Sequence, residues 1–140
     1  MDKITSKSNE KVKYIKSLND KKYRQKYDMF YIEGIKVIEE IMKSKKAIDI
    51  MFIAYSKDIL INLNGGKELL NKLKKIKNIS IYELSKEVFE YVVETKTPQG
   101  VLAVVKKNNS QYKDINKEDS IIILDRLQDL RKYWNNNTKC

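Results

Sequence analysis

Short apolar runs alternate along the chain with longer amphipathic stretches. Residues 101–105 form an uninterrupted apolar run, which predicts a strand. Val12, Ile15 and Leu18 instead recur at a spacing that places them along one side of a helix. The pattern predicts strands at 28–33, 48–54, 79–82 and 101–105, and helices at about 10–18, 20–27, 35–42, 67–77 and 85–92.

Capping and turn residues stand where these helices are expected to begin. Asn9 and Ser85 precede two of the predicted helices, and Ser56 is placed to cap a short turn. The Gly65-Gly66 pair marks a break before the helix at 67–77 and is interpreted as a turn, because no phosphate-binding glycine loop surrounds it. Strands that alternate with helices predict an α/β layered domain over residues 28–106.

The pattern changes after residue 106. Residues 107–119 are polar and charged without periodicity, which predicts a linker. Ile121 to Leu124 is again a short apolar run of the kind found in strands buried on both faces. The tail that follows has no apolar period with which to cover such a strand. We therefore expect residues 120–140 to be the truncated start of a second domain.

Charge is concentrated at the N-terminal end. The chain has 29 Lys and Arg against 19 Asp and Glu, a formal net charge of +10. Residues 1–26 contribute nine basic and three acidic residues, which is +6 of that total. Uniform solubilising charge would not cluster in this way, so a nucleic acid is the favoured partner. A solvated basic face is the alternative, with an anionic membrane surface well behind it.

The composition excludes several classes of chemistry. The chain has no histidine, and its single cysteine is Cys140, so histidine-based catalysis, internal disulfides and cysteine metal clusters are ruled out. No apolar stretch approaches the ~20 residues of a membrane span, and no signal-peptide core is present at the start. We expect a cytoplasmic protein without a membrane partner, and we assign no catalytic, cofactor-binding or metal-binding residue.

The basic N-terminal segment, residues 1–27, is the candidate RNA-contacting region. Its Lys21-Lys-Tyr-Arg24 stretch interleaves an aromatic ring with three cations, which suits phosphate contacts and base stacking. Alternatively, Tyr23 and Tyr27 pack under the first strand while the lysines remain in water. The loop around Gln99 is either a plain turn or a ligand contact, and the Lys72 to Lys77 run is a solvated helix face or a weaker RNA contact. The predicted RNA-binding residues are Asn9, Lys13, Lys21, Lys22, Arg24 and Gln99.

Several segments, taken in order, resemble the SpoU (TrmH) type of RNA ribose 2′-O-methyltransferases, one of the SPOUT enzymes. The resemblance covers residues 4–129. The segments are Ile4-Thr-Ser-Lys-Ser-Asn9, Lys21-Lys-Tyr-Arg24, Phe30-Tyr-Ile-Glu-Gly34, Thr97-Pro-Gln-Gly-Val-Leu-Ala103 and Ile121-Ile-Ile-Leu-Asp-Arg-Leu-Gln-Asp129. It implies an α/β/α sandwich like the ribosomal kink-turn-binding proteins, followed by the first strand of a SPOUT domain. In the intact family that SPOUT domain binds S-adenosylmethionine, dimerises and carries the catalytic arginine.

The tail departs from the family pattern, which continues with proline and then Asn-(Ile/Leu)-Gly-Thr-Ile-(Ile/Val)-Arg-(Thr/Ser). Leu130 replaces the proline. One permitted choice of codons for residues 132–140, read one nucleotide later, encodes Asn-Ile-Gly-Thr-Ile-Ile-Arg-Ser. Our hypothesis is a frameshift in the codons for residues 131–132. Sequencing the gene tests it, because no family motif downstream in the shifted frame would refute it.

The sequence as a whole predicts the RNA-binding part of an RNA 2′-O-ribose methyltransferase, directed at ribosomal RNA in intact relatives. This chain is expected to be inactive by itself, without a cofactor of its own. The alternative is a stand-alone RNA-binding adaptor of the kink-turn type, and a third interpretation is a basic protein–protein module.

Overall fold

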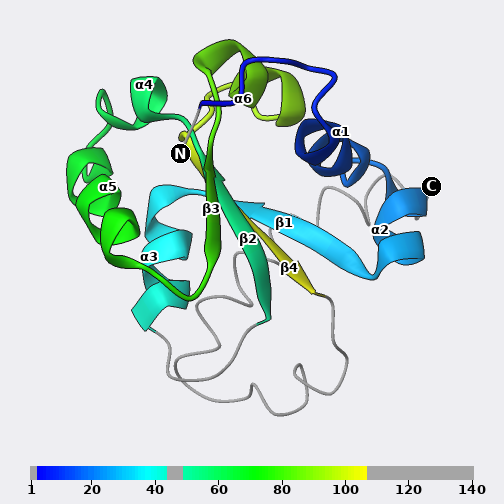
Figure 1. Cartoon of the computed structure of the whole chain (residues 1–140), viewed down its shortest axis with the longest axis horizontal. Coiled ribbons are helices and arrows are strands. Elements are labelled where there is room, and N and C mark those ends of the chain that lie inside the picture. The colour runs from blue at the N-terminus through cyan, green and yellow to red at the C-terminus, as the bar shows by residue number, and fades with distance from the viewer. Residues whose placement is uncertain (1–2, 44–48, 107–140) are drawn as a thin grey trace.

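A four-stranded mixed sheet forms the middle of the fold in the computed structural model, which describes residues 3–43 and 49–106 (Figure 1). The predicted elements are present, with small shifts at their ends. In chain order they are α1 (Glu10–Ser17), α2 (Lys21–Tyr27), β1 (Met29–Glu33), α3 (Ile35–Lys43), β2 (Ile50–Tyr55), α4 (Lys57–Leu60), α5 (Gly66–Lys75), β3 (Ser80–Glu83), α6 (Lys86–Val92) and β4 (Val101–Lys106).

The last strand of the described chain lies inside the sheet rather than at its edge. The strand order is β1-β4-β2-β3, with β4 antiparallel to both β1 and β2, and with β2 and β3 parallel. Residues 101–105 are all buried because β4 has a strand on each side and helices over both faces. This arrangement explains the continuous apolar run of β4, since neither face of that strand meets water.

Helices cover both faces of the sheet and give it two apolar cores. One core joins the sheet to α3, α4 and α5, and the other joins it to α1 and α6. Alternate residues of β4 enter the two cores: Ala103 lies in the first, and Leu102 and Val104 lie in the second. Figure 1 shows α3 and α5 on one side of the strands and α1 and α6 on the other. The predicted α/β class is confirmed.

The basic N-terminal segment packs directly on this α/β unit. Val12, Ile15 and Leu18 of α1 are at most 1% exposed and belong to the second core. Ahead of α1, Ile4 forms a parallel bridge to Leu84, just after β3. The predicted segment 1–27 thus contributes apolar side chains to the same core as residues 28–106, and its lysines are left to face outward.

Most predicted caps are formed, with one exception. The side chains of Asn9 and Ser85 accept backbone N–H bonds at the starts of α1 and α6, as predicted, and Asp20 does the same at the start of α2, where no cap was predicted. Ser56 precedes α4 as expected, but its hydroxyl makes no capping bond. It is fully buried and has no hydrogen-bond partner among the described residues. The prediction that Ser56 is a side-chain cap is therefore wrong.

The predicted linker at 107–119 and the predicted start of a second domain at 120–140, with its strand at Ile121 to Leu124, lie outside the described residues. Within the described ranges, no helix is long and apolar enough to cross a membrane.

Candidate nucleic-acid interface

The exposed lysines of α1 and α2 follow from the way these helices pack. Val12 and Ile15 turn one side of α1 into the core, and Leu18 at its C-cap follows them, so Lys11 and Lys13 on the other side are exposed. On α2, residues 21 and 22 directly follow the Asp20 cap and are exposed. Three of the predicted RNA contacts, Lys13, Lys21 and Lys22, are exposed here together with Lys11 and Lys26.

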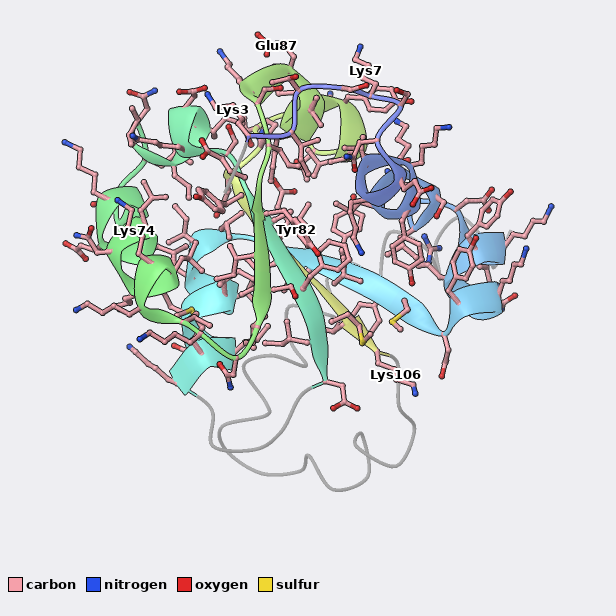
Figure 2. All side chains as sticks on the ribbon, in the orientation of Figure 1. Lys3, Lys7, Lys74, Tyr82, Glu87 and Lys106 are labelled. Atoms are coloured by element: carbon pink, nitrogen blue, oxygen red, sulfur yellow. The ribbon has the colours of Figure 1, made fainter. Side chains whose placement is uncertain are left out.

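Five aromatic rings form a connected series across this region, which we call the aromatic path: Tyr23, Tyr27, Tyr14, Phe52 and Tyr82. Successive ring centroids are 5.9, 5.0, 6.4 and 5.5 Å apart. The path starts on α2, passes over α1 and ends on the neighbouring strands β2 and β3; Figure 2 labels Tyr82 at the β3 end. The α2 end of the path is partly exposed, since Tyr27 is 37% exposed, whereas Phe52 further along the path is buried.

Lysine ammonium groups lie over several rings of the aromatic path. The Nζ of Lys11 is 5.5 Å from the ring centroids of both Phe52 and Tyr82. Lys22 lies 5.6 Å from the Tyr23 centroid, and Lys26 lies within 5.9 Å of both rings of α2. Such cation–π contacts hold positive charge beside an aromatic surface. Cations and aromatic rings are therefore adjacent on this surface, a combination that also occurs in many single-strand-binding proteins.

Arg24 does not share this exposure. Its side chain is buried, and Nη1 donates a hydrogen bond of 2.9 Å to the Leu18 carbonyl oxygen at the end of α1. Burial lowers the pKa of Arg24, while the charges of Asp20 and Glu94 act to raise it. The guanidinium is used inside the protein, where it attaches α2 to α1. The hydrogen bond to Leu18 gives Arg24 a role in positioning α2, and its predicted contact with RNA stays a prediction.

Replacing Arg24 with methionine is expected to lower the free energy of unfolding by about 2–3 kcal/mol, because a buried charged hydrogen bond is lost and the Leu18 carbonyl loses its donor. The matched change Lys21→Met, on an exposed position of the same helix, is expected to cost less than about 0.5 kcal/mol. Urea unfolding followed by circular dichroism measures both. Wild-type stability with lost RNA binding in Arg24→Met would instead place the guanidinium on the RNA.

Asn9 and Gln99 also have structural tasks. The Asn9 side-chain oxygen accepts the N–H groups of Lys11 and Val12 at 2.8 and 3.4 Å. Gln99 Oε1 accepts the Ile35 N–H at 3.0 Å, at the start of α3. Gln99 therefore lies near the end of β1, whereas α2 precedes the start of that strand. Their oxygens hold helix ends, so these two residues are the weaker RNA candidates.

The loop before β4 is held in shape by Glu33. Its carboxylate accepts the Thr95 hydroxyl at 2.8 Å and the Gln99 N–H at 2.9 Å. Burial raises the pKa of Glu33, and these two hydrogen bonds partly offset the rise. A second connection runs from the Tyr31 hydroxyl to Asn19, whose side chain donates to the Val92 carbonyl at 2.7 Å. The turn between α1 and α2 is thereby attached to β1 and α6.

Sequence reasoning missed much of the aromatic path. It singled out Tyr23 and Tyr27, but Tyr14, Phe52 and Tyr82 come from other elements and carry no shared motif. Tyr27 packs on Tyr14 of α1 and remains 37% exposed, so it is not covered by the first strand. The α5 lysines lie over the opposite core; Figure 2 shows Lys74 on the side of the molecule away from α2.

Residues 9–103 match the model of the MRM3-like substrate binding domain, a range that runs from the Asn9 cap into β4. The chain belongs to this family. The MRM3-like domain is the substrate-binding domain of SpoU/TrmH RNA 2′-O-methyltransferases, so the resemblance seen in the sequence is confirmed.

Among curated proteins, the 23S rRNA (guanosine(2553)-2′-O)-methyltransferase RlmP of Bacillus subtilis is 32% identical over 129 residues, covering 92% of this chain and 46% of that protein. Among solved structures, an RNA 2′-O ribose methyltransferase has a TM-score of 0.61 at 20% identity, over 84% of this chain and 41% of that one. An AdoMet-bound rRNA methyltransferase from Sinorhizobium meliloti has a TM-score of 0.59 at 21% identity, with the same coverage. The chain spans less than half the length of these relatives.

Proposed function

We propose that this MRM3-like domain binds structured ribosomal RNA and presents it for 2′-O-methylation of a ribose. The observation that carries the proposal is the surface formed by α1 and α2, which exposes five lysines, three of which (Lys11, Lys22 and Lys26) lie over rings of the aromatic path. The family match supports substrate binding as the task of this domain. The sheet with helices on both faces supports a likeness to ribosomal kink-turn-binding proteins.

The similarity to RlmP suggests which RNA to use as a probe. RlmP is named for guanosine 2553 of 23S rRNA. The purified chain should bind a transcript of the segment around that nucleotide more tightly than a transcript of equal length from elsewhere in the same rRNA. Filter binding at several salt concentrations measures both affinities. Equal, salt-insensitive binding to both transcripts would favour a protein–protein module instead.

We further propose that the residues of this chain carry no methyl transfer by themselves. The support is that the match covers the substrate-binding domain, whereas a relative in the same family was solved with AdoMet bound. In the intact family the cofactor and the dimer contact would belong to the SPOUT domain. Incubation with methyl-labelled S-adenosylmethionine and ribosomal RNA tests this, and clear incorporation of label would overturn it. A cytoplasmic location is part of the same proposal.

A further inference from the structure

The rings of α2 are fixed at the protein surface. Tyr23 and Tyr27 are four residues apart, so they lie on one side of the helix, and their planes are inclined by only 24°. Beneath them, Tyr27 rests on Tyr14 of α1, and Arg24 joins the two helices from the buried side. A nucleobase that stacks on these rings would therefore not have to order them first.

Two lysine ammonium groups lie over the Tyr23 ring. Lys22 and Lys26 are exposed, and their ammonium groups lie 5.6 and 5.9 Å from the Tyr23 centroid. Stacking of a base on an aromatic ring is worth more than a cation–π contact in water. An arriving base can displace an ammonium group, which then moves to the adjacent phosphate. The cation–π contact is thereby replaced by two contacts, the base on the ring and the ammonium group on the phosphate.

We propose that the two α2 rings of the aromatic path, Tyr23 and Tyr27, bind unpaired RNA bases by stacking, with Lys22 and Lys26 on the flanking phosphates. The proposal rests on the function proposed above and names the part of the RNA that this surface recognises. Bases in an RNA duplex are stacked on one another, and their faces are closed to protein side chains. An apolar protein partner fits less well, because the rings are lined by charged lysines. The ligand class is a bulge, loop or single strand.

The test compares one RNA in two forms. A fluorescein-labelled unstructured RNA and the duplex that it forms with its complement are titrated with the full chain, and anisotropy gives both affinities. The variant is Tyr23→Leu/Tyr27→Leu, which keeps the apolar contact with Tyr14 but removes the stacking surface. Tyr91→Leu is the matched control. Tyr91 is also 37% exposed, and the Nζ atoms of Lys7 and Lys16 lie 4.9 and 4.7 Å from its ring centroid. Unlike Tyr23 and Tyr27, however, it belongs to α6. Urea unfolding checks that each variant is folded.

The wild-type chain is expected to bind the single strand more tightly than the duplex. The double variant should lose about tenfold or more in single-strand affinity, with an unchanged salt slope and unchanged duplex binding. Tyr91→Leu should match wild type. A folded double variant that binds the single strand like wild type overturns the stacking proposal alone. If the wild-type chain binds the rRNA transcript but not the single strand, the stacking proposal is overturned and the proposed function stands; if it binds none of the three RNAs, both are overturned.

Discussion

Replacing Lys13, Lys21 and Lys22 with glutamine is expected to weaken RNA binding by about tenfold or more at low salt. All three side chains are exposed on α1 and α2, the helices that carry Tyr14, Tyr23 and Tyr27. Each lysine that neutralises a phosphate releases about one counterion, so the slope of log affinity against log salt should fall by about two to three. Titrations of the rRNA transcript at several salt concentrations measure both quantities.

The matched control removes the same charge from the opposite face. Lys67, Lys74 and Lys75 are exposed on α5, which packs on the other core, and Lys72 is left in place because it pairs with Glu39 at 3.2 Å. Glutamine at these three positions should leave the salt slope within about one unit of wild type. Equal losses in both triple variants would mean that total charge, and not the α1 and α2 surface, determines binding.

Gly66→Ala is expected to destabilise the fold more than any surface change. A Cβ at Gly66 would lie 1.7 Å from the Leu60 carbonyl oxygen and 2.6 Å from its carbonyl carbon. These are backbone atoms, so the clash can be relieved only if α5 moves away from α4. We expect a loss of roughly 3 kcal/mol or more in the free energy of unfolding. Urea unfolding followed by circular dichroism is the measurement.

Gly65→Ala is the natural comparison, because the adjacent position has space for a Cβ but an unfavourable backbone. The nearest atom would be 3.7 Å away, and the φ of Gly65 is +82°. Only the cost of the left-handed conformation applies, about 1–2 kcal/mol. A loss in Gly66→Ala no greater than that in Gly65→Ala would mean that α4 and α5 approach less closely than the structure places them.

The order of helices and strands could be predicted from the sequence because its signals are local. The apolar stripe of α1, the caps at Asn9 and Ser85 and the continuous apolar run of β4 each act within a few residues. The clustered positive charge and the family motifs could also be identified from the sequence alone. The exposure of Lys13 follows from the apolar stripe of α1, since a charge away from that stripe faces water.

The environment of Arg24 could not be predicted from local sequence patterns. In the sequence it is one more cation in a basic run, and nothing adjacent indicates that its guanidinium turns inward to the Leu18 carbonyl. The same limit applies to Ser56, whose position suits a cap although its hydroxyl is buried without one. Both outcomes depend on which neighbouring element covers the residue, and periodicity carries no information about that.

The sequence by itself determined the elements, the basic segment and the family. Only the tertiary structure decided that β4 enters the sheet between β1 and β2, that α1 completes the second core, and that Tyr23 and Tyr82 lie at the two ends of one path of rings. The physical reason is that strand order and helix placement are set by burial and pairing between residues far apart in the chain. The surface that we propose for RNA exists only after those distant contacts have formed.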